Sequence, residues 1–486
     1  MSLAEVVLHF GRTRHYECAL VEDDRVISYG ELARLVATTG TYLAKLGIRC
    51  GDRVGICVPD TSDHLVALLA VAQSGAVAVP LEWRATPSEN GRLVADLNLA
   101  CVLVAAPARG VENCATVAID AQWHAGVAQA SPSTASPAGW HDTFIIAATS
   151  GSTGKPKFTA TTHLQYYLNI VANWELMELA GRHRCLATLP FYYGAGRTSC
   201  MTHLLRGDCL VLYSSVFAPA EYVEIVNRLG ITVVGAVPST VRQLLAAGGQ
   251  VPLFPKLARF FVTGAPLHAN EKREAAQWLT PHFYEKYGSA EVSTMTILRP
   301  GDLEDRADSV GQPHSLARIE AVDDNDQPLP SGAVGALRFR TPGMGSPLPE
   351  SADTERFRKG WFYPGEIGRI DDAGYVFLNG RASDVIMRGG AKIYPAEIET
   401  TLAQHPGVLE VAVLGRRGPR NEEEVVAFVV PKGVARTADL LAHCRMRLTP
   451  HKVPRQFFLI PEMPKTASGK IDKIALVERL SLEDPV

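Results

Sequence analysis

The chain has 486 residues, of which 47% are hydrophobic and 20% are charged, and its formal net charge is −3 at pH 7. This length predicts two or three domains with large buried cores, and the nearly balanced charge argues against a nucleic-acid-binding surface. Nine cysteines without a paired spacing argue against a zinc site and are typical of a reducing compartment.

The N-terminal ten residues show no basic stretch followed by an apolar run, which argues against a signal peptide. No stretch of about 18 uncharged apolar residues occurs, so no membrane span is expected. We therefore expect a cytoplasmic protein that has neither a membrane nor a nucleic acid as its partner.

The first third of the chain alternates between strand-like and helix-like segments. Ser28 and Glu31 form a capping-box pattern before an amphipathic run to Lys45. Strands are expected at Arg53–Val58, Ala76–Val79 and Cys101–Ala105, and helices at Ser62–Ser74 and Ser88–Leu97. This order predicts a parallel sheet covered by helices.

The same alternation continues after a Ser/Pro/Ala-rich surface linker at residues 129–139. Strands are expected at Phe144–Ala148, Cys209–Leu212, Val233–Val237 and Phe260–Val262, and helices at Ala220–Leu229 and Ser239–Ala247. After about residue 320 the sequence predicts short strands among turns, such as Leu337–Arg340 and Tyr375–Leu378.

A small separate α+β unit is expected from Arg381 onward, with strands at Val411–Leu414 and Val425–Val430 and a helix at Ala438–Leu448. The predicted fold class is therefore α/β. A large N-terminal domain, residues 1–380, consists of layered α/β subdomains with a parallel sheet, and residues 381–486 form a small α+β C-terminal domain.

The strongest local motif is the Gly/Ser/Thr-rich segment from Thr149 to Lys157 (TSGSTGKPK), which follows an expected strand directly. Its glycines let the backbone approach anionic oxygens, and its hydroxyls and lysines are donors suited to a triphosphate. It is not a Walker A loop, because Thr149 stands where the first glycine belongs and Pro156 follows Lys155. A flexible basic linker is the alternative interpretation.

Three further motifs are weaker when each is taken alone. In the segment 285–291, Tyr287 beside Gly288 can form a wall for a purine and Glu291 can hold Mg²⁺, although such a step is often only a turn. Glu366 follows a Pro-Gly turn and is either a ribose ligand or an exposed turn acid. Lys470 lies on a Gly-containing loop and either reaches a developing negative charge or is solvated.

In their order and spacing, these motifs resemble those of the adenylate-forming superfamily, and the chain is closest in character to the acyl-CoA synthetases. The superfamily also contains aryl-CoA synthetases, adenylation domains of peptide synthetases and firefly-type luciferases. Residues 149–157 match its phosphate loop, and Val262–Leu267 resemble its adenine-contacting segment. Residues 380–384 with 393–399 resemble its hinge motif, and Pro464–Lys470 match the segment of its catalytic lysine.

The resemblance covers essentially the whole chain and implies ATP-dependent activation of a carboxylic acid as an acyl-adenylate, with release of pyrophosphate. It further implies that the small C-terminal domain then rotates and that a thioester forms with coenzyme A. The implied cofactors are ATP, Mg²⁺ and coenzyme A.

The resemblance also implies residue roles. Lys470 and Glu291 are the expected catalytic residues, with Thr153 and Glu291 placing the metal. Ser383 is the expected hinge residue, and Gly389 and Gly390 are expected to line the coenzyme A channel. The expected ATP-binding residues are Thr149, Ser150, Gly151, Ser152, Thr153, Gly154, Lys155, Lys157, Gly264, Ala265, Pro266, Glu285, Lys286, Tyr287, Gly288, Ser289, Glu366 and Arg381.

The sequence departs from the family pattern at a few of these positions. Glu366 stands where the family has Asp, Ala290 where it has Thr, and Ser383 where it has Asp or Lys. Met387 replaces a lysine expected shortly after the hinge. Ser289 is a candidate to supply the hydroxyl that Ala290 lacks. Activity is still expected, because none of these changes removes the catalytic lysine, the acidic residue or the phosphate loop.

The expected acyl pocket contains Tyr192, Tyr193, Gly194 and Arg197. No aspartate stands there to pair with an amino group, so an α-amino acid is disfavoured. The two tyrosines could line a pocket for an aromatic or medium aliphatic acid. The tyrosines could instead gate access of ATP. Arg197 either binds a second carboxylate or, as most arginines in such positions do, pairs internally or faces solvent.

Two alternatives in function stay open. The chain could be a free-standing adenylation enzyme that loads an acyl group onto a carrier protein, or a non-catalytic nucleotide-binding relative. The expected partners are therefore a small carboxylic acid and either coenzyme A or a carrier protein, and a homodimer is left open.

Overall fold

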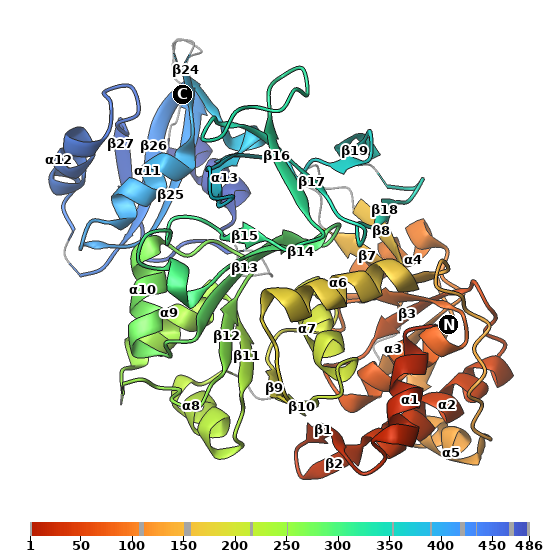
Figure 1. Cartoon of the computed structure of the whole chain (residues 1–486). Coiled ribbons are helices and arrows are strands. Elements are labelled where there is room, and N and C mark those ends of the chain that lie inside the picture. Colours follow the sequence, from red (N-terminus) through yellow and green to blue (C-terminus); the bar gives the residue numbers. More distant parts are fainter. Residues whose placement is uncertain are drawn as a thin grey trace.

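The computed structural model describes residues 2–105, 111–149, 157–213, 217–249, 251–351, 354–388, 391–417, 423–433, 435–465 and 471–483. The larger N-terminal part consists of sheets layered with helices, and a smaller part near the C-terminus lies against one end of it (Figure 1). No helix in this described part is long and apolar enough to cross a membrane.

The largest sheet is parallel from β1 through β10, β9, β11 and β12 to β13, and antiparallel at both edges. Its strands, as far as the chain is described, are in spatial order β15 (Gln312–Pro313), β14 (Ser293–Leu298), β13 (Phe283–Ser289), β12 (Arg259–Val262), β11 (Val233–Ala236), β9 (Arg184–Ala187), β10 (Cys209–Leu212), β1 (Cys18–Glu22) and β2 (Arg25–Ser28).

A second sheet comes mostly from the first 162 residues and combines a parallel part with an antiparallel hairpin of β7 and β8. Its described strands are, in spatial order, β18 (Ser346–Pro347), β8 (Lys157–Thr162), β7 (Thr143–Thr149), β4 (Val77–Pro80), β3 (Arg53–Cys57), β5 (Cys101–Ala105) and β6 (Thr116–Ile119).

Helices cover these sheets, and one hydrophobic core joins them. Leu20 of β1, Ile56 of β3 and Leu68 of α3 all belong to this core and are fully buried. The helices are α1 (Ala4–Thr13), α2 (Tyr29–Lys45), α3 (Ser62–Gln73), α4 (Pro87–Leu97), α5 (Ala121–Gln129), α6 (His163–Leu176), α7 (Gly194–Leu204), α8 (Pro219–Arg228), α9 (Pro238–Ala247) and α10 (Ala269–Trp278).

A third sheet follows the first two along the chain and is built from short strands. It contains β16 (Arg318–Val322), β17 (Gly335–Arg340), β19 (Phe357–Arg358), β20 (Trp361–Phe362), β21 (Glu366–Ile370) and β22 (Val376–Arg381). Three single turns of 3₁₀-helix lie near it in the chain: η1 (Pro300–Asp302), η2 (Thr354–Arg356) and η3 (Ala382–Asp384).

The C-terminal part has its own core, in which Ile398 and Val413 are fully buried. It contains β23 (Ile386–Arg388), β24 (Ala391–Ile393), α11 (Pro395–Ala403), β25 (Val408–Arg417), β26 (Glu423–Pro431), α12 (Thr437–Arg447), β27 (Gln456–Leu459) and α13 (Lys473–Glu483). The expected boundary between residues 380 and 381 falls at the end of β22, and the division into two domains stays a prediction.

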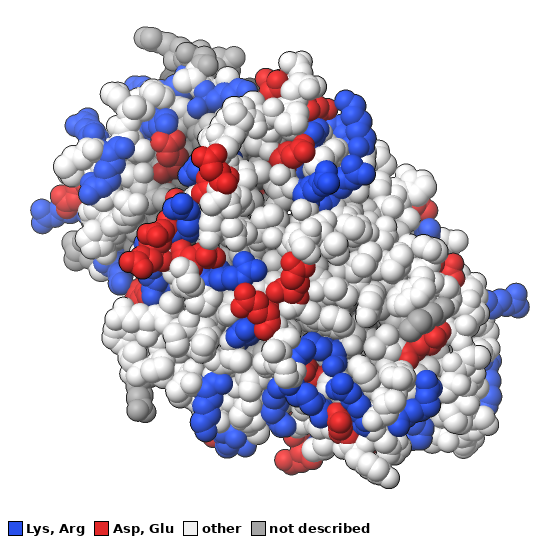
Figure 2. Space-filling view, viewed as in Figure 1, with Lys and Arg blue, Asp and Glu red and all other residues white. Residues whose placement is uncertain are grey.

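The predicted fold class is confirmed, and several elements have the expected bounds. The strands Cys101–Ala105 and Cys209–Leu212 are reproduced to the residue, and Ser28 accepts a hydrogen bond from the Glu31 N–H at the start of α2. Sequence reasoning predicted β7 but missed α6, α7 and the partner strand β8, which forms a hairpin with β7. Lys and Arg side chains lie interspersed with Asp and Glu over the visible face (Figure 2), with no extended basic patch in this view.

Candidate active site

The strand β13 positions the first group of predicted site residues. Its N-terminal half is buried, whereas Gly288 and Ala290 are exposed at its carboxyl end. A β-bulge separates Tyr287 from Gly288 where β13 pairs with β14, and a Cβ at Gly288 would clash with the Ser293 carbonyl. Glycine is therefore required at this step for a packing reason, and the bulge re-aims the residues that follow it.

The predicted ribose residues lie beside the predicted adenine residue. Glu366 begins β21 and stands opposite Arg381, the last residue of β22, in the register of the two strands. The Tyr287 hydroxyl donates a short hydrogen bond to Glu366 Oε2. Three residues that are distant in sequence thus converge, and the longer Glu366 side chain reaches the tyrosine on the neighbouring sheet.

Glu291, the predicted metal ligand, is 7% exposed in the turn after β13. Its Oε1 lies 3.3 Å from Arg356 Nη1, and its backbone carbonyl accepts a hydrogen bond of 2.9 Å from the Gly345 N–H. Among the described residues, Oε1 of this carboxylate accepts a hydrogen bond from Arg356. Oε2 accepts none from the described part of the chain and is left available.

The metal-ligand oxygens that the protein offers at Glu291 fit a Mg²⁺ ion that is also bound by phosphate. The described ranges contain no group of three His, Cys, Asp or Glu side chains able to hold a metal ion. Mg²⁺ commonly takes one or two protein carboxylates and completes its shell with water and substrate phosphates. A single carboxylate with one oxygen available therefore suits a metal bound together with ATP.

Neighbouring positions add small residues and an unsatisfied hydroxyl. The Ser289 Oγ is buried and has no hydrogen-bond partner among the described residues. Gly264 has a φ of +97°, a conformation that favours glycine, and it follows β12 at the same end of the sheet as the carboxyl end of β13. Ala265 is half-buried and Pro266 is exposed. These positions suit a flat ligand edge, and their contacts with ATP stay predictions.

Glu285 and Lys286 differ from the other predicted ATP-binding residues of β13, because both are buried. Glu285 is 3% exposed, and its Oε2 lies 2.5 Å from Nζ of the buried Lys272 of α10. Lys286 Nζ lies 4.3 Å from the centre of the Phe261 ring, and burial lowers the pKa of this lysine to about 7. Both side chains are buried in contacts within the protein, and the ATP-binding role expected for these two residues stays a prediction.

The predicted acyl-pocket residues lie at the start of α7. Tyr192, Tyr193 and Gly194 are half-buried, and burial raises the pKa of Tyr192 to about 12. Arg197 is 4% exposed, and its Nη1 donates to the carbonyls of Phe191 (3.1 Å) and Tyr192 (3.0 Å). Of its two expected roles, the structure favours internal pairing: the guanidinium shapes the turn that carries the tyrosines.

In the C-terminal part, Ser383 is exposed and its hydroxyl donates to Asp384 Oδ1 at 2.8 Å. Asp384 Oδ2 lies 3.0 Å from Nζ of Lys473, the first residue of α13. This ion pair links the predicted hinge to the helix that follows the predicted catalytic lysine.

Several predicted residues lie outside the described part of the chain. They are Ser150, Gly151, Ser152, Thr153, Gly154, Lys155, Gly389, Gly390 and Lys470. Thr149 and Lys157, which flank the glycine-rich segment, are register partners at the ends of β7 and β8, and the side chain of Lys157 is half-buried. The roles expected for the whole set stay predictions.

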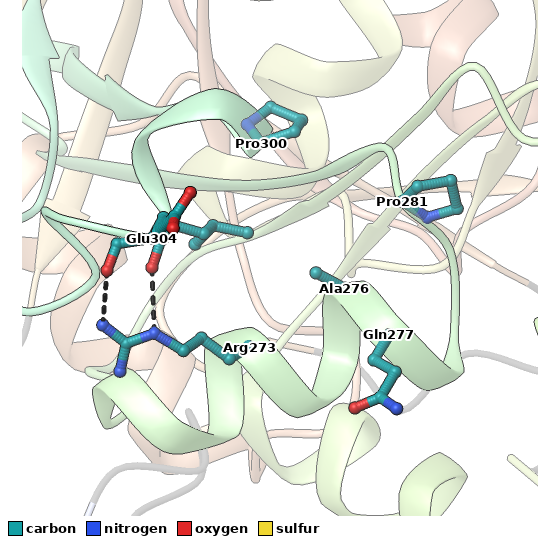
Figure 3. A pocket seen from close by; sticks show the side chains of 7 residues that line it. Arg273, Ala276, Gln277, Pro281, Pro300 and Glu304 are labelled. Carbon is teal, nitrogen blue, oxygen red and sulfur yellow. Dashed lines mark hydrogen bonds between the residues drawn. The ribbon is translucent and has the colours of Figure 1, made fainter.

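A surface pocket elsewhere on the molecule contains none of the predicted site residues. It lies between α10 and the segment 300–304, and Arg273 closes one side by donating to the carbonyls of Leu303 and Glu304, each at 3.0 Å (Figure 3). We assign it no role in the site.

The arginine that pairs with Glu291 was not among the residues predicted from the sequence. Arg356 lies in the segment E-R-F-R-K before the Gly360–Glu366 motif, where two arginines and a lysine follow one another closely. Such a run is normally a solvated surface, and only folding shows that one of its members turns toward a carboxylate 65 residues away.

Known proteins resemble the chain over most of its length. A model of the AMP-binding enzyme family matches residues 9–347, and a model of the AMP-binding enzyme C-terminal domain matches residues 397–470. The chain is 33% identical over 466 residues to a feruloyl-CoA synthase from Amycolatopsis sp, with 92% of each chain covered.

Two solved structures have the same fold. ATP-bound MatB from Rhodopseudomonas palustris superposes with a TM-score of 0.89 at 25% identity, covering 99% of each chain. The o-succinylbenzoate coenzyme A synthetase MenE from Bacillus subtilis, in complex with ATP and a magnesium ion, gives a TM-score of 0.86 at 24% identity, again over 99% of each chain.

Proposed function

The chain belongs to the family of AMP-binding enzymes, and on this premise we propose that it activates a small carboxylic acid with ATP and transfers the acyl group to coenzyme A. The observation that carries the proposal is the convergence of Tyr287, Glu291, Glu366 and Arg381 at the carboxyl end of β13 and the adjoining end of β21 and β22. A nucleotide with a metal-bound triphosphate needs these groups together.

In the proposed first step, an oxygen of the acid forms a bond with the α-phosphorus of ATP while the bond from that phosphorus to the departing pyrophosphate breaks. Lys470 is proposed to hold the carboxylate and the α-phosphate together. Its contribution is electrostatic and positional, because this type of transfer leaves little covalent work for the protein. Mg²⁺, when bound, neutralises phosphate charge, and Glu291 with Thr153 is proposed to place it.

In the proposed second step, the thiol of coenzyme A attacks the acyl carbon and AMP leaves. The 381–486 unit is proposed to rotate about Ser383 between the two steps, so that Gly389 and Gly390 reach the coenzyme A channel. The ion pair between Asp384 and Lys473 supports this proposal, because it lets α13 and the residues next to the hinge move as one body.

The proposed substrate is an aromatic or medium aliphatic monocarboxylic acid. Tyr192 and Tyr193 offer half-buried rings at the start of α7. Nη1 of Arg197 donates to two backbone carbonyls, which supports internal pairing over binding of a second carboxylate. The name of the feruloyl-CoA synthase relative supports trying hydroxylated aromatic acids first.

The test is release of pyrophosphate and AMP with a panel of carboxylic acids, with and without coenzyme A. The proposal expects one class of acid to give multiple turnovers only with coenzyme A, together with an acyl-CoA product. Release that ignores coenzyme A would instead favour a carrier protein as acceptor, and no release with any acid would favour the non-catalytic alternative. The Lys470→Ala variant should lose about 10²–10³-fold in pyrophosphate release, and wild-type release would remove this lysine from its proposed role.

A further inference from the structure

We infer that Arg356 is a positioning residue, which orients Glu291 toward Mg²⁺–ATP and at the same time fixes the turn that carries Glu366. The inference rests on the proposed function, because it concerns how the chain prepares that site for its nucleotide. Arg356 itself lies beside the proposed metal and ribose ligands and is not proposed to touch the reacting atoms.

The guanidinium of Arg356 joins two segments of the chain. Its Nη1 reaches Glu291 Oε1 at 3.3 Å, its Nε donates to the Tyr363 carbonyl at 2.8 Å, and its Nη2 donates to the Pro364 carbonyl at 2.9 Å. The Tyr363 N–H in turn donates to the Arg356 carbonyl at 2.8 Å, and the guanidinium stacks 4.6 Å from the centre of the Phe362 ring. These contacts hold the arginine in one orientation.

Glu366, two residues after Pro364, closes this network. It accepts the short hydrogen bond of Tyr287, which precedes Glu291 by four residues on the same chain segment. The proposed metal carboxylate and the proposed ribose carboxylate are therefore connected twice, once through Arg356 and once through Tyr287. Displacing either carboxylate would disturb the other.

The charge of Arg356 also matters, because the side chain of Glu291 is only 8% exposed. A buried carboxylate without a counter-charge is costly and is not held in one orientation. The arginine holds one oxygen, while Oε2 has no hydrogen bond among the described residues. A carboxylate fixed through one oxygen and open at the other is the arrangement that a monodentate Mg²⁺ ligand requires.

Arginine is needed here because of its shape. Three nitrogens of its planar guanidinium donate to three different oxygens. A lysine ammonium is a single point donor on a flexible stem and cannot hold Glu291 and both carbonyls of the turn together. The inference therefore predicts that Arg356→Lys keeps the charge and loses most of the positioning.

The experiment measures ATP binding by calorimetry at a series of Mg²⁺ concentrations, without any acid substrate. The quantity of interest is the ratio of the ATP dissociation constants without and with Mg²⁺, which reports how well the protein ligates the metal. We expect Arg356→Met to lower this ratio about tenfold or more, the size usual for residues that orient metal ligands, with Arg356→Lys intermediate. Thermal unfolding confirms that each variant is folded at the temperature of the titration.

Arg358→Met is the matched control. Arg358 lies two residues further along, is half-exposed, and pairs with Asp326 at 3.0 Å and with the Tyr363 ring instead of Glu291. It should keep the wild-type ratio. In a Glu291→Gln background, Arg356→Met should cause little further loss, because the group that it orients is already gone.

The outcomes separate the inference from the proposed function. If Arg356→Met lowers the unfolding temperature but keeps the wild-type ratio, the arginine is only structural and the inference is wrong. The inference would also be overturned if Arg356→Met lowered the ratio of ATP dissociation constants by the same factor in the wild-type and the Glu291→Gln backgrounds. If the wild type does not bind ATP at any Mg²⁺ concentration, the proposed function itself fails.

Discussion

In the buried half of β13, Glu285 pairs with Lys272 inside the protein, whereas Glu291, just beyond the carboxyl end of the same strand, pairs with Arg356 beside exposed residues. Both carboxylates have a cation within 3.3 Å and little exposed surface. They differ in what surrounds them. The first pair is enclosed between α10 and the sheet, and the second adjoins Gly288, Ala290 and the turn of Glu366.

Position along the strand, and not the presence of charge, therefore distinguishes an ionisable group enclosed by the fold from one that a ligand can reach. In an α/β sheet, ligands bind outside the carboxyl ends of the parallel strands. Glu285 and Lys286 are enclosed before that end, and Tyr287 and Glu291 lie at it. Substitutions at the enclosed pair should mainly change stability, and substitutions at the pair beyond the strand should mainly change activity.

The largest expected effect is at the enclosed pair. Lys272→Met leaves Glu285 buried without its cation and should destabilise the fold by about 3–5 kcal/mol. Burial already raises the pKa of Glu285, and the loss of Lys272 removes the charge that opposes this rise. The midpoint of urea unfolding, followed by circular dichroism at pH 7, measures the effect.

The double variant Lys272→Met/Glu285→Leu is the control for that prediction. It replaces both charges by apolar groups and should recover most of the lost stability, because a buried ion pair usually gains little over a packed apolar pair. An unchanged midpoint in Lys272→Met alone would mean that the pair is not enclosed as described.

At the exposed end of the strand, the expected effect falls on activity. Glu291→Gln keeps the shape of the side chain but removes the negative charge proposed for Mg²⁺, and acid-dependent pyrophosphate release should fall about 10²-fold. The urea midpoint should change much less than in Lys272→Met, because the amide can still accept a hydrogen bond from Arg356. If Glu291→Gln releases pyrophosphate at the wild-type rate but unfolds at a lower urea concentration, the role of Glu291 is structural.

Features of the structure that depend on a few neighbouring residues could be predicted from the sequence, and features that depend on contacts between distant segments could not. Local patterns determined the strand Cys101–Ala105 and the start of α2 at Ser28, because caps and apolar runs act over a few residues. The alternation of strand-like and helix-like segments was enough to predict the α/β fold class. The pairing of Glu291 with Arg356 and the burial of Glu285 depend on contacts between distant segments, which a single sequence does not specify.

The smallest expected effect concerns Lys286, which has no acidic partner among the described residues and lies against Phe261. Because burial lowers its pKa to about 7, well below the usual range of a lysine, the unfolded chain binds this proton more tightly than the folded protein does. The lysine therefore destabilises the fold most below pH 7, and its cost is relieved as the pH rises from about 7 toward the unfolded pKa.

Lys286→Met should stabilise the protein by about 1–2 kcal/mol at pH 6 and by less at pH 9. This figure already allows for the stabilisation lost when the ammonium leaves the Phe261 ring. The matched control is Lys45→Met, which removes an exposed lysine. In this variant the free energy of unfolding should differ between pH 6 and pH 9 by as much as in the wild type. If Lys286→Met is destabilised at both pH values, the buried ammonium of Lys286 must be stabilised by a partner, and the prediction is wrong.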